Sequence, residues 1–149
     1  MTKTLSKNDS NFTKLLSKTI TVIGYILAFL GFIFNLGAIF GTIWITDPNY
    51  NGYPFANNNW EVTVQAYLVL STIFSSAGFL AERLIGLSNG GQALKCSIGS
   101  SWFCSFICMT VAMSVYTGYT ASGQYGYSYS FGWTSSALHF LAGLAYMIL

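Results

Sequence analysis

The sequence predicts an all-α membrane protein that folds as a four-helix transmembrane bundle. Of its 149 residues, 53% are hydrophobic and only 7% are charged, whereas an ordinary soluble domain is about 25% charged. So few charges cannot cover a soluble globule, and the remaining surface must face lipid. Residues 19–46, 62–81 and 96–149 carry no charge at all. The first two stretches are each long enough for one transmembrane helix, and the last is long enough for two.

The four predicted spans lie at about residues 19–45, 62–81, 96–116 and 131–149. The first span follows lysines, as in a signal peptide, but its apolar run is longer than the usual hydrophobic region of such a peptide. We therefore expect a retained helix. One transmembrane domain, residues 19–149, then follows an N-terminal segment of residues 1–18. The connections at residues 46–61 and 117–130 form two outer loops.

The basic residues all fall on one side of this arrangement. They are Lys3, Lys7, Lys14, Lys18, Arg83 and Lys95. Because lysine and arginine are enriched in cytoplasmic segments, we expect both termini to be cytoplasmic. The outer side carries Asp47 and Glu61. Six dispersed basic residues do not form the patch that nucleic-acid binding needs, so we expect no nucleic-acid partner.

Two polar residues, Asn35 and His139, fall deep inside predicted spans. A polar side chain in hydrocarbon must find a hydrogen-bond partner or bear a desolvation cost of a few kcal/mol. Both residues lie at similar depths below the outer ends of spans 1 and 4, which predicts an interhelical hydrogen bond between them if these spans are neighbours. The alternative is a proton relay or pH sensor centred on the single histidine. The structural tie is favoured, because no acidic residue or lysine accompanies His139 within the membrane.

Small residues at helical spacing predict surfaces where helices pack closely. They are Gly24 and Ala28, Gly37 and Gly41 in span 1, Ser71 and Ser75 in span 2, and Gly143 in span 4. Such spacing does not distinguish packing within the bundle from packing against another protein.

The three cysteines, Cys96, Cys104 and Cys108, all fall in or beside span 3, so neither outer loop can hold an internal disulfide. Cys104 and Cys108 share a helix face, but we expect buried thiols rather than a metal pair, because no histidine or carboxylate lies nearby in the sequence. Cys96 is a candidate for palmitoylation by its position beside Lys95. No nucleotide-binding, metalloprotease or serine-hydrolase motif is present, so we expect neither catalysis nor a cofactor.

Aromatic residues gather at the predicted outer boundary. Those singled out as outer-face contacts are Trp44, Trp60, Tyr125, Tyr127, Tyr129 and Trp133. An aromatic belt at the membrane interface accounts for most of them. The tract at residues 125–130 is richer in tyrosine than a belt requires, and tyrosine with glycine and serine is also typical of adaptable contact surfaces. Belt and partner contact both remain open for this tract.

Several segments have the pattern of one tetraspan family. They are Val64-Gln65-Ala66, residues 70–75, Gly90-Gly91, residues 127–133 and residues 141–149, with Trp44 closing span 1. On these residues the chain resembles the superfamily of peripheral myelin proteins, epithelial membrane proteins and claudins, and is most similar to the myelin and epithelial branch. The resemblance implies a left-handed, claudin-like four-helix bundle that acts through contacts with like molecules, other membrane proteins or lipid, without catalysis.

The first outer loop departs from the family pattern. Residues 47–60 lack the family's Gly-Leu-Trp motif and its pair of disulfide-bonded cysteines. The loop is also too short for the family's four-stranded sheet, since a strand takes about 5–6 residues. We therefore expect a reduced first extracellular loop and no claudin-type paracellular pore.

Two functions follow from these observations. The favoured hypothesis is a non-enzymatic protein of the plasma membrane or a cell junction that organises membrane or cell–cell contacts through packing with other membrane proteins or itself. The alternative is an auxiliary subunit of a larger channel or receptor, docked through the small-residue faces of spans 1 and 4.

Overall fold

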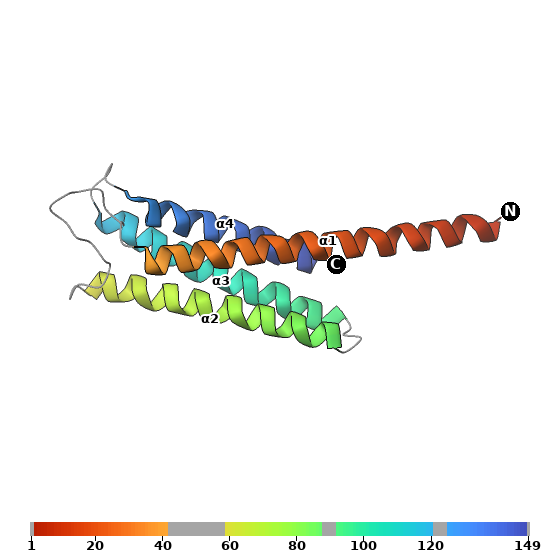
Figure 1. Cartoon of the computed structure of the whole chain (residues 1–149), viewed down its shortest axis with the longest axis horizontal. Helices are drawn as coiled ribbons and strands as arrows, with labels where there is room; N and C mark the ends of the chain where they lie inside the picture. Colours follow the sequence, from red (N-terminus) through yellow and green to blue (C-terminus); the bar gives the residue numbers. More distant parts are fainter. Residues whose placement is uncertain (1, 42–58, 88–91, 121–124, 149) are drawn as a thin grey trace.

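The computed structural model describes residues 2–41, 59–87, 92–120 and 125–148, and within them the side chains of residues 12–41, 59–84, 93–120 and 125–148. It contains four α-helices (Figure 1): α1 (Thr2–Phe40), α2 (Asn59–Leu87), α3 (Gln92–Tyr119) and α4 (Tyr127–Met147). The predicted all-α four-helix bundle is confirmed. Trp44 and nearly all of the first outer loop lie outside the described residues.

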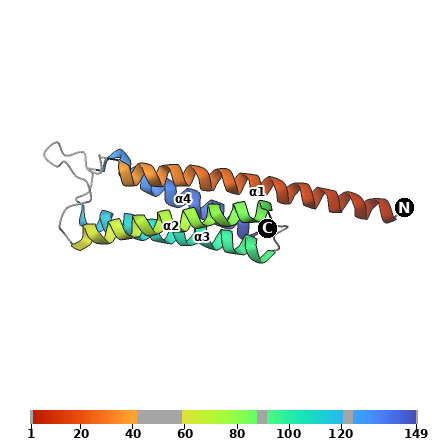
Figure 2. The same ribbon diagram turned by 60° about the horizontal axis from the view of Figure 1, so that its bottom comes forward.

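The helices pack in the spatial order α1, α4, α3, α2. The principal contacts join α2 to α3, α1 to α4 and α3 to α4, and the contact between α1 and α2 is much the smallest of the four. Figures 1 and 2 show α4 running alongside α1. Spans 1 and 4 are therefore neighbours, and α1 meets α2 only along a narrow seam.

Buried positions in the helices repeat with alternating spacings of three and four residues. In α1 they are Gly24, Ala28, Gly31, Asn35 and Ala38; in α2 Glu61, Val64, Leu68, Ser71, Ser75 and Gly78; in α4 Ser128, Gly132, Ser135, His139, Ala142 and Tyr146. A seven-residue repeat drifts slowly around a straight helix, so helices that keep such a face in contact wind around one another with a left-handed twist. This repeat is the signature of the left-handed bundle.

The distribution of polar and apolar side chains is reversed relative to a soluble bundle. Large hydrophobic side chains stand on the outside, among them Ile26, Val69, Ile73 and Leu141, while asparagine, serine and histidine occupy the interior. Water would favour the opposite arrangement, with polar side chains outside and apolar side chains inside. The outer surface is therefore matched to lipid, and the interior polar groups have to bond to one another.

Three helices are long and apolar enough to cross a membrane by length and composition: residues Phe12–Phe40 of α1, Asn59–Leu84 of α2 and Ala93–Tyr119 of α3. The fourth predicted span, α4, is not among these helices, and it contains several serines and the histidine. These polar side chains are largely buried against the other helices. α4 runs alongside α1 and α3 within the bundle (Figure 1), so these polar residues form its inward face.

Each helix described extends beyond the predicted span at one or both ends. The largest extension is at the N-terminus, where α1 contains 39 residues and is therefore about 58 Å long, roughly twice the thickness of a hydrocarbon core. Its N-terminal part projects past the other three helices (Figures 1 and 2). The reason is that no glycine or proline interrupts residues 2–23, whereas the predicted boundary was set by hydropathy alone.

Candidate functional site

A chain of hydrogen bonds crosses the centre of the bundle and involves all four helices. Its members are Asn35 of α1, Ser71 and Ser75 of α2, Ser105 of α3 and His139 of α4, all with an exposed fraction of 0%. Asn35 Nδ2 lies 3.1 Å from Ser71 Oγ. The distances Ser71–Ser105, Ser105–Ser75 and Ser75 Oγ–His139 Nε2 are each 2.8 Å. Asn35 and His139 are thus connected through three serines rather than by a direct bond.

The partners of His139 determine which of its ring nitrogens carries the proton. Its Nδ1 lies 2.9 Å from the carbonyl oxygen of Ser135, which can only accept, so Nδ1 carries the proton and Nε2 accepts from Ser75. The Asn35 amide donates to Ser71 Oγ. The Ser105 hydroxyl lies within hydrogen-bond distance of two acceptors, Ser75 Oγ at 2.8 Å and the Ser71 carbonyl oxygen at 3.0 Å. The Ser135 hydroxyl completes the network by donating to the Gly31 carbonyl of α1 at 2.8 Å.

This network is suited to holding the helices together. Ser71 lies midway along α2 between Trp60 and Glu82, so the hydrogen-bond chain lies near the middle of the bundle's length. No acidic or lysine side chain is among its members, and a relay requires further ionisable groups on both sides. Among the described residues, the network therefore has the composition expected of a structural link between helices.

Replacing Ser105 with alanine is expected to lower the free energy of unfolding by about 1 kcal/mol, because Ser71 and Ser75 each lose a hydrogen-bond partner within a buried site. Titration of the purified protein with SDS, followed by helical circular dichroism, measures this change. The matched control is Ser101→Ala on the same helix, whose hydroxyl bonds only to the Ser97 carbonyl one turn away. Equal losses in the two variants would contradict the role of the network.

A second tie lies at the end of the bundle opposite Trp60, which is the predicted inner end, and it was not predicted from the sequence. The Tyr146 hydroxyl of α4 donates to the Glu82 carboxylate of α2 and lies 3.4 Å from the Thr21 carbonyl of α1. The Tyr146 ring packs edge-on against buried Trp102, with centroids 4.7 Å apart. Glu82, which was not singled out from the sequence, thus points to α4. The sequence feature that could have indicated this tie is the seven-residue spacing from His139 to Tyr146, which places both residues on one face of the helix.

Three of the predicted outer-face aromatic residues are engaged within the bundle. Trp60 stacks on Tyr119 with centroids 5.4 Å apart, and Tyr125 stacks on Tyr129 at 4.2 Å. The Tyr129 hydroxyl also lies 2.9 Å from Thr117 Oγ1. Trp60, Tyr125 and Tyr129 all pack against the outer core cluster. They close the outer end of the bundle and leave little of their rings for a partner.

Tyr127 and Trp133 are different, because 45% and 39% of their surfaces are exposed. Trp133 lines an open apolar groove of about 330 Å³ between α3 and α4. The other lining residues are Phe106, Thr110, Ser136, Ala137 and Phe140. The Thr110 and Ser136 hydroxyls are 2.7 Å apart and satisfy one another. The groove thus offers an apolar surface at the outer half of the bundle.

The small residues of α1 face α4. A Cβ atom added at Gly24 would lie 2.8 Å from Tyr146, one at Gly37 would lie 2.9 Å from Phe131, and one at Gly41 would overlap Ser128. Ala28 is fully buried with α4 residues in the inner core cluster. Gly143 of α4 faces Gly99 of α3, with each added Cβ atom 3.1–3.2 Å from the opposite carbonyl oxygen. The sequence reasoning missed Gly99, and also Gly78 and Gly132, which face Trp102 and Met113.

The cysteines are free thiols, with Cys96 exposed near the start of α3, Cys104 partly buried and Cys108 buried. Among the described residues, no group of three or more histidine, cysteine, aspartate or glutamate side chains is placed to hold a metal ion. Cys96 therefore remains the candidate for modification, and the other two thiols belong to the packing of α3.

Comparison with known proteins gives a consistent set of relatives. No family model matches the chain. Human epithelial membrane protein 2 is 28% identical over 131 residues, which covers 74% of this chain and 77% of that protein. The Bos taurus protein of the same name is 32% identical over 102 residues, covering 58% and 60%. Human epithelial membrane protein 1 is 28% identical over 102 residues, covering 64% of each chain. These similarities confirm the resemblance to the myelin and epithelial branch.

Proposed function

Because this chain is an integral membrane protein homologous to the epithelial membrane proteins, we propose that it is a non-enzymatic organiser of membrane or cell–cell contacts. It acts by packing against other membrane proteins, including further copies of itself. The interior polar groups support this proposal, since they bond to neighbouring helices and hold the bundle together. The surfaces left for function are therefore the outer end and the lipid-facing sides.

The observation that carries the proposal is the exposed Trp133, which lines the groove between α3 and α4. Tyr127 is also exposed but contacts Phe131, on the side of α4 that faces α1. Exposed tryptophan and tyrosine are the residues that most often supply binding energy at protein interfaces. Trp133 stands at the rim of an apolar groove, where a side chain from a partner can be buried. This arrangement fits sideways contact between proteins in the outer leaflet.

Replacing Trp133 with alanine is expected to weaken self-association about tenfold, as loss of a central aromatic contact does. The measurement is energy transfer between donor- and acceptor-labelled copies of the whole chain, reconstituted in phosphatidylcholine vesicles at several protein-to-lipid ratios. Ile73→Ala is the control, because Ile73 is an exposed apolar residue on α2. Association that is absent in the unchanged protein, or is lowered equally by both variants, would contradict the proposal.

An auxiliary subunit remains the second candidate, with a larger channel or receptor as partner. The small-residue faces of α1 and α4 are occupied by each other and by α3, so such a partner would have to use the groove or another lipid-facing side. A mild-detergent pull-down from native membranes, with crosslinking and mass spectrometry, separates the two functions. Recovery of one stoichiometric larger protein favours the auxiliary subunit, and recovery mainly of this chain favours the organiser.

The proposed location is the plasma membrane or a cell junction, with both termini in the cytoplasm. Lys14, Lys18 and Arg83 support this orientation, because all three are exposed at the end of the bundle opposite Trp60. Labelling of Cys96 with a membrane-impermeant maleimide, before and after permeabilising cells, tests the orientation. Cytoplasmic Cys96 would also be accessible for palmitoylation.

A further inference from the structure

The seam between α1 and α2 is joined chiefly by one aromatic side chain. Phe79 of α2 contacts the rings of Tyr25, Phe29 and Phe32 of α1, with centroids 5.7, 6.5 and 5.6 Å away. Of the four principal helix pairs, this one has the smallest mutual contact. Phe29 and Leu80 beside the seam are exposed. The seam therefore presents an apolar strip to the inner leaflet.

The inner end of this seam is flanked by two cations. The Tyr146 hydroxyl contacts both the Glu82 carboxylate and the Thr21 carbonyl, which places Thr21 of α1 and Glu82 of α2 at the same level. Lys18 lies one turn before Thr21, and Arg83 directly follows Glu82. Both side chains are exposed. The two positive charges therefore stand on opposite sides of the seam, where it meets the membrane surface.

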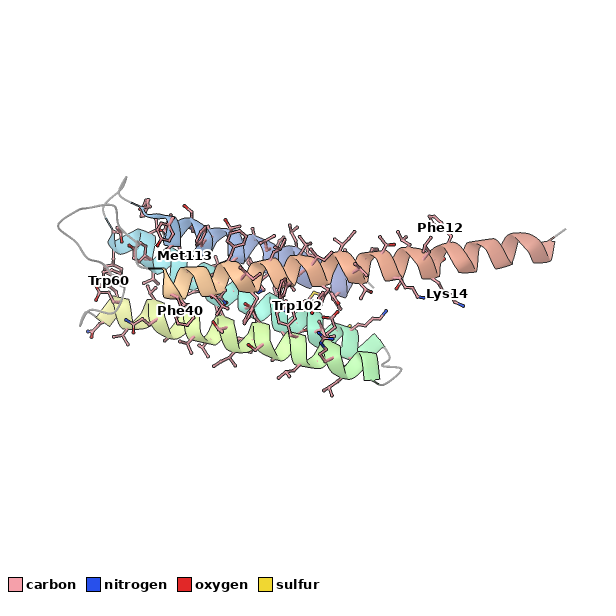
Figure 3. All side chains as sticks on the ribbon, in the orientation of Figure 1. Phe12, Lys14, Phe40, Trp60, Trp102 and Met113 are labelled. Atoms are coloured by element: carbon pink, nitrogen blue, oxygen red, sulfur yellow. The ribbon has the colours of Figure 1, made fainter. Side chains whose placement is uncertain are left out.

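The Glu82 carboxylate interacts electrostatically with Arg83 and also accepts from the Tyr146 hydroxyl. Neither Lys18 nor Arg83 forms an ion pair within the described part of the chain. The other described acidic side chain, Glu61, is at the opposite end of α2. A third cation, Lys14, leaves α1 on the side on which α2 lies, and Phe12 leaves on the opposite side (Figure 3). Anionic headgroups are the membrane component that complements such a site.

We propose that the chain binds one anionic phospholipid at this place. Its phosphate lies between Lys18 and Arg83, with Lys14 close by, and its acyl chain runs along the strip formed by Phe29, Phe79 and Leu80. The lipid fills the side of the bundle where α1 and α2 touch least. It would thereby hold α1 in position against α2.

The test is native mass spectrometry of the whole purified chain in detergent micelles, titrated with dioleoyl phosphatidylserine or dioleoyl phosphatidylcholine. We expect one phosphatidylserine molecule to be retained at concentrations that leave phosphatidylcholine unbound. The double variant Lys18→Ala/Arg83→Ala is expected to weaken phosphatidylserine binding about fivefold for each charge removed. Circular dichroism checks that the variant is folded, as expected from the exposure of both side chains.

The matched control is Lys3→Ala/Lys7→Ala, which removes the same charge from the far end of α1. We expect it to change phosphatidylserine binding less than twofold. Two results would overturn the proposal. One is equal retention of the two lipids by the unchanged chain. The other is an equal loss of binding in both double variants, which would show diffuse attraction to a positive surface instead of a site.

Discussion

Replacing Trp102 with alanine is expected to lower the free energy of unfolding by about 3–5 kcal/mol. Trp102 is fully buried at the inner end of the bundle. It contacts the ring of Phe79 on α2 at 5.8 Å and that of Tyr146 on α4 at 4.7 Å. It also fills the space left by Gly78, where an added Cβ atom would overlap the indole. Its removal leaves a cavity among three helices, which the midpoint of an SDS titration would report.

Trp133→Ala is the matched control for this experiment, because it makes the same chemical change at an exposed position. We expect it to shift the midpoint by less than about 1 kcal/mol. The two variants thus have different expected effects: Trp102→Ala lowers the free energy of unfolding, whereas Trp133→Ala weakens self-association. A similar loss of stability in both variants would show that the inner cluster is not a centre of the fold.

Replacing Gly143 with leucine is expected to lower the free energy of unfolding by about 1–3 kcal/mol. An added Cβ atom would lie 3.2 Å from the Gly99 carbonyl oxygen and 3.3 Å from the Phe103 backbone nitrogen. Backbone atoms cannot turn aside as a side chain can, so α3 and α4 would have to separate. The same SDS titration measures the loss, and the groove beside Phe103 and Phe140 would be distorted with it.

Gly118→Leu on α3 is the control for Gly143→Leu. Nothing lies within 4 Å of a Cβ atom added at Gly118. Because leucine favours the helical conformation more than glycine, we expect no loss of stability there. If Gly143→Leu were also neutral, the close approach of α3 and α4 would not be needed for folding.

The helices were predictable from the sequence because lipid imposes a strong constraint on composition. Three uncharged stretches were enough to predict four spans, and four helices are present. The extent of α1 was not predictable from hydropathy, because Lys3, Lys7, Lys14 and Lys18 are unfavourable in lipid but compatible with a helix. Continuity of a helix depends on the absence of glycine and proline, which is a separate property from membrane solubility.

The central polar chain was only partly predictable. Asn35 and His139 stand out in apolar sequence, and their similar depths indicated a link. The serines between them did not stand out, because serine is also a common small packing residue in membrane helices. Ser71 and Ser75 were predicted as packing positions, and Ser105 was not singled out. Their role depends on which faces of α2 and α3 meet, which a single sequence does not specify.

The contacts of the outer aromatic residues were likewise only partly predictable from the sequence. Composition could not divide them between belt, partner contact and internal stacking. Tyr125, Tyr127 and Tyr129 alternate along a short tract, yet Tyr125 and Tyr129 stack on each other and Tyr127 faces outward. The tract enters α4 at Tyr127, so the relevant spacing from there is helical. Within the helix Tyr127 meets Phe131 four residues on, whereas Tyr125 precedes the helix and stacks on Tyr129.

The polar inner face of α4 has a consequence for biosynthesis. A ribosome delivers α1, α2 and α3 before α4, and α4 is the one described helix that is not long and apolar enough to cross a membrane by length and composition. Its Ser135, His139 and Ser136 bond to Gly31 of α1, Ser75 of α2 and Thr110 of α3. Every one of these partners is thus already synthesised when α4 arrives. Stable insertion of the last helix therefore depends on the first three having assembled, so a defect in any of them would become apparent at the final step.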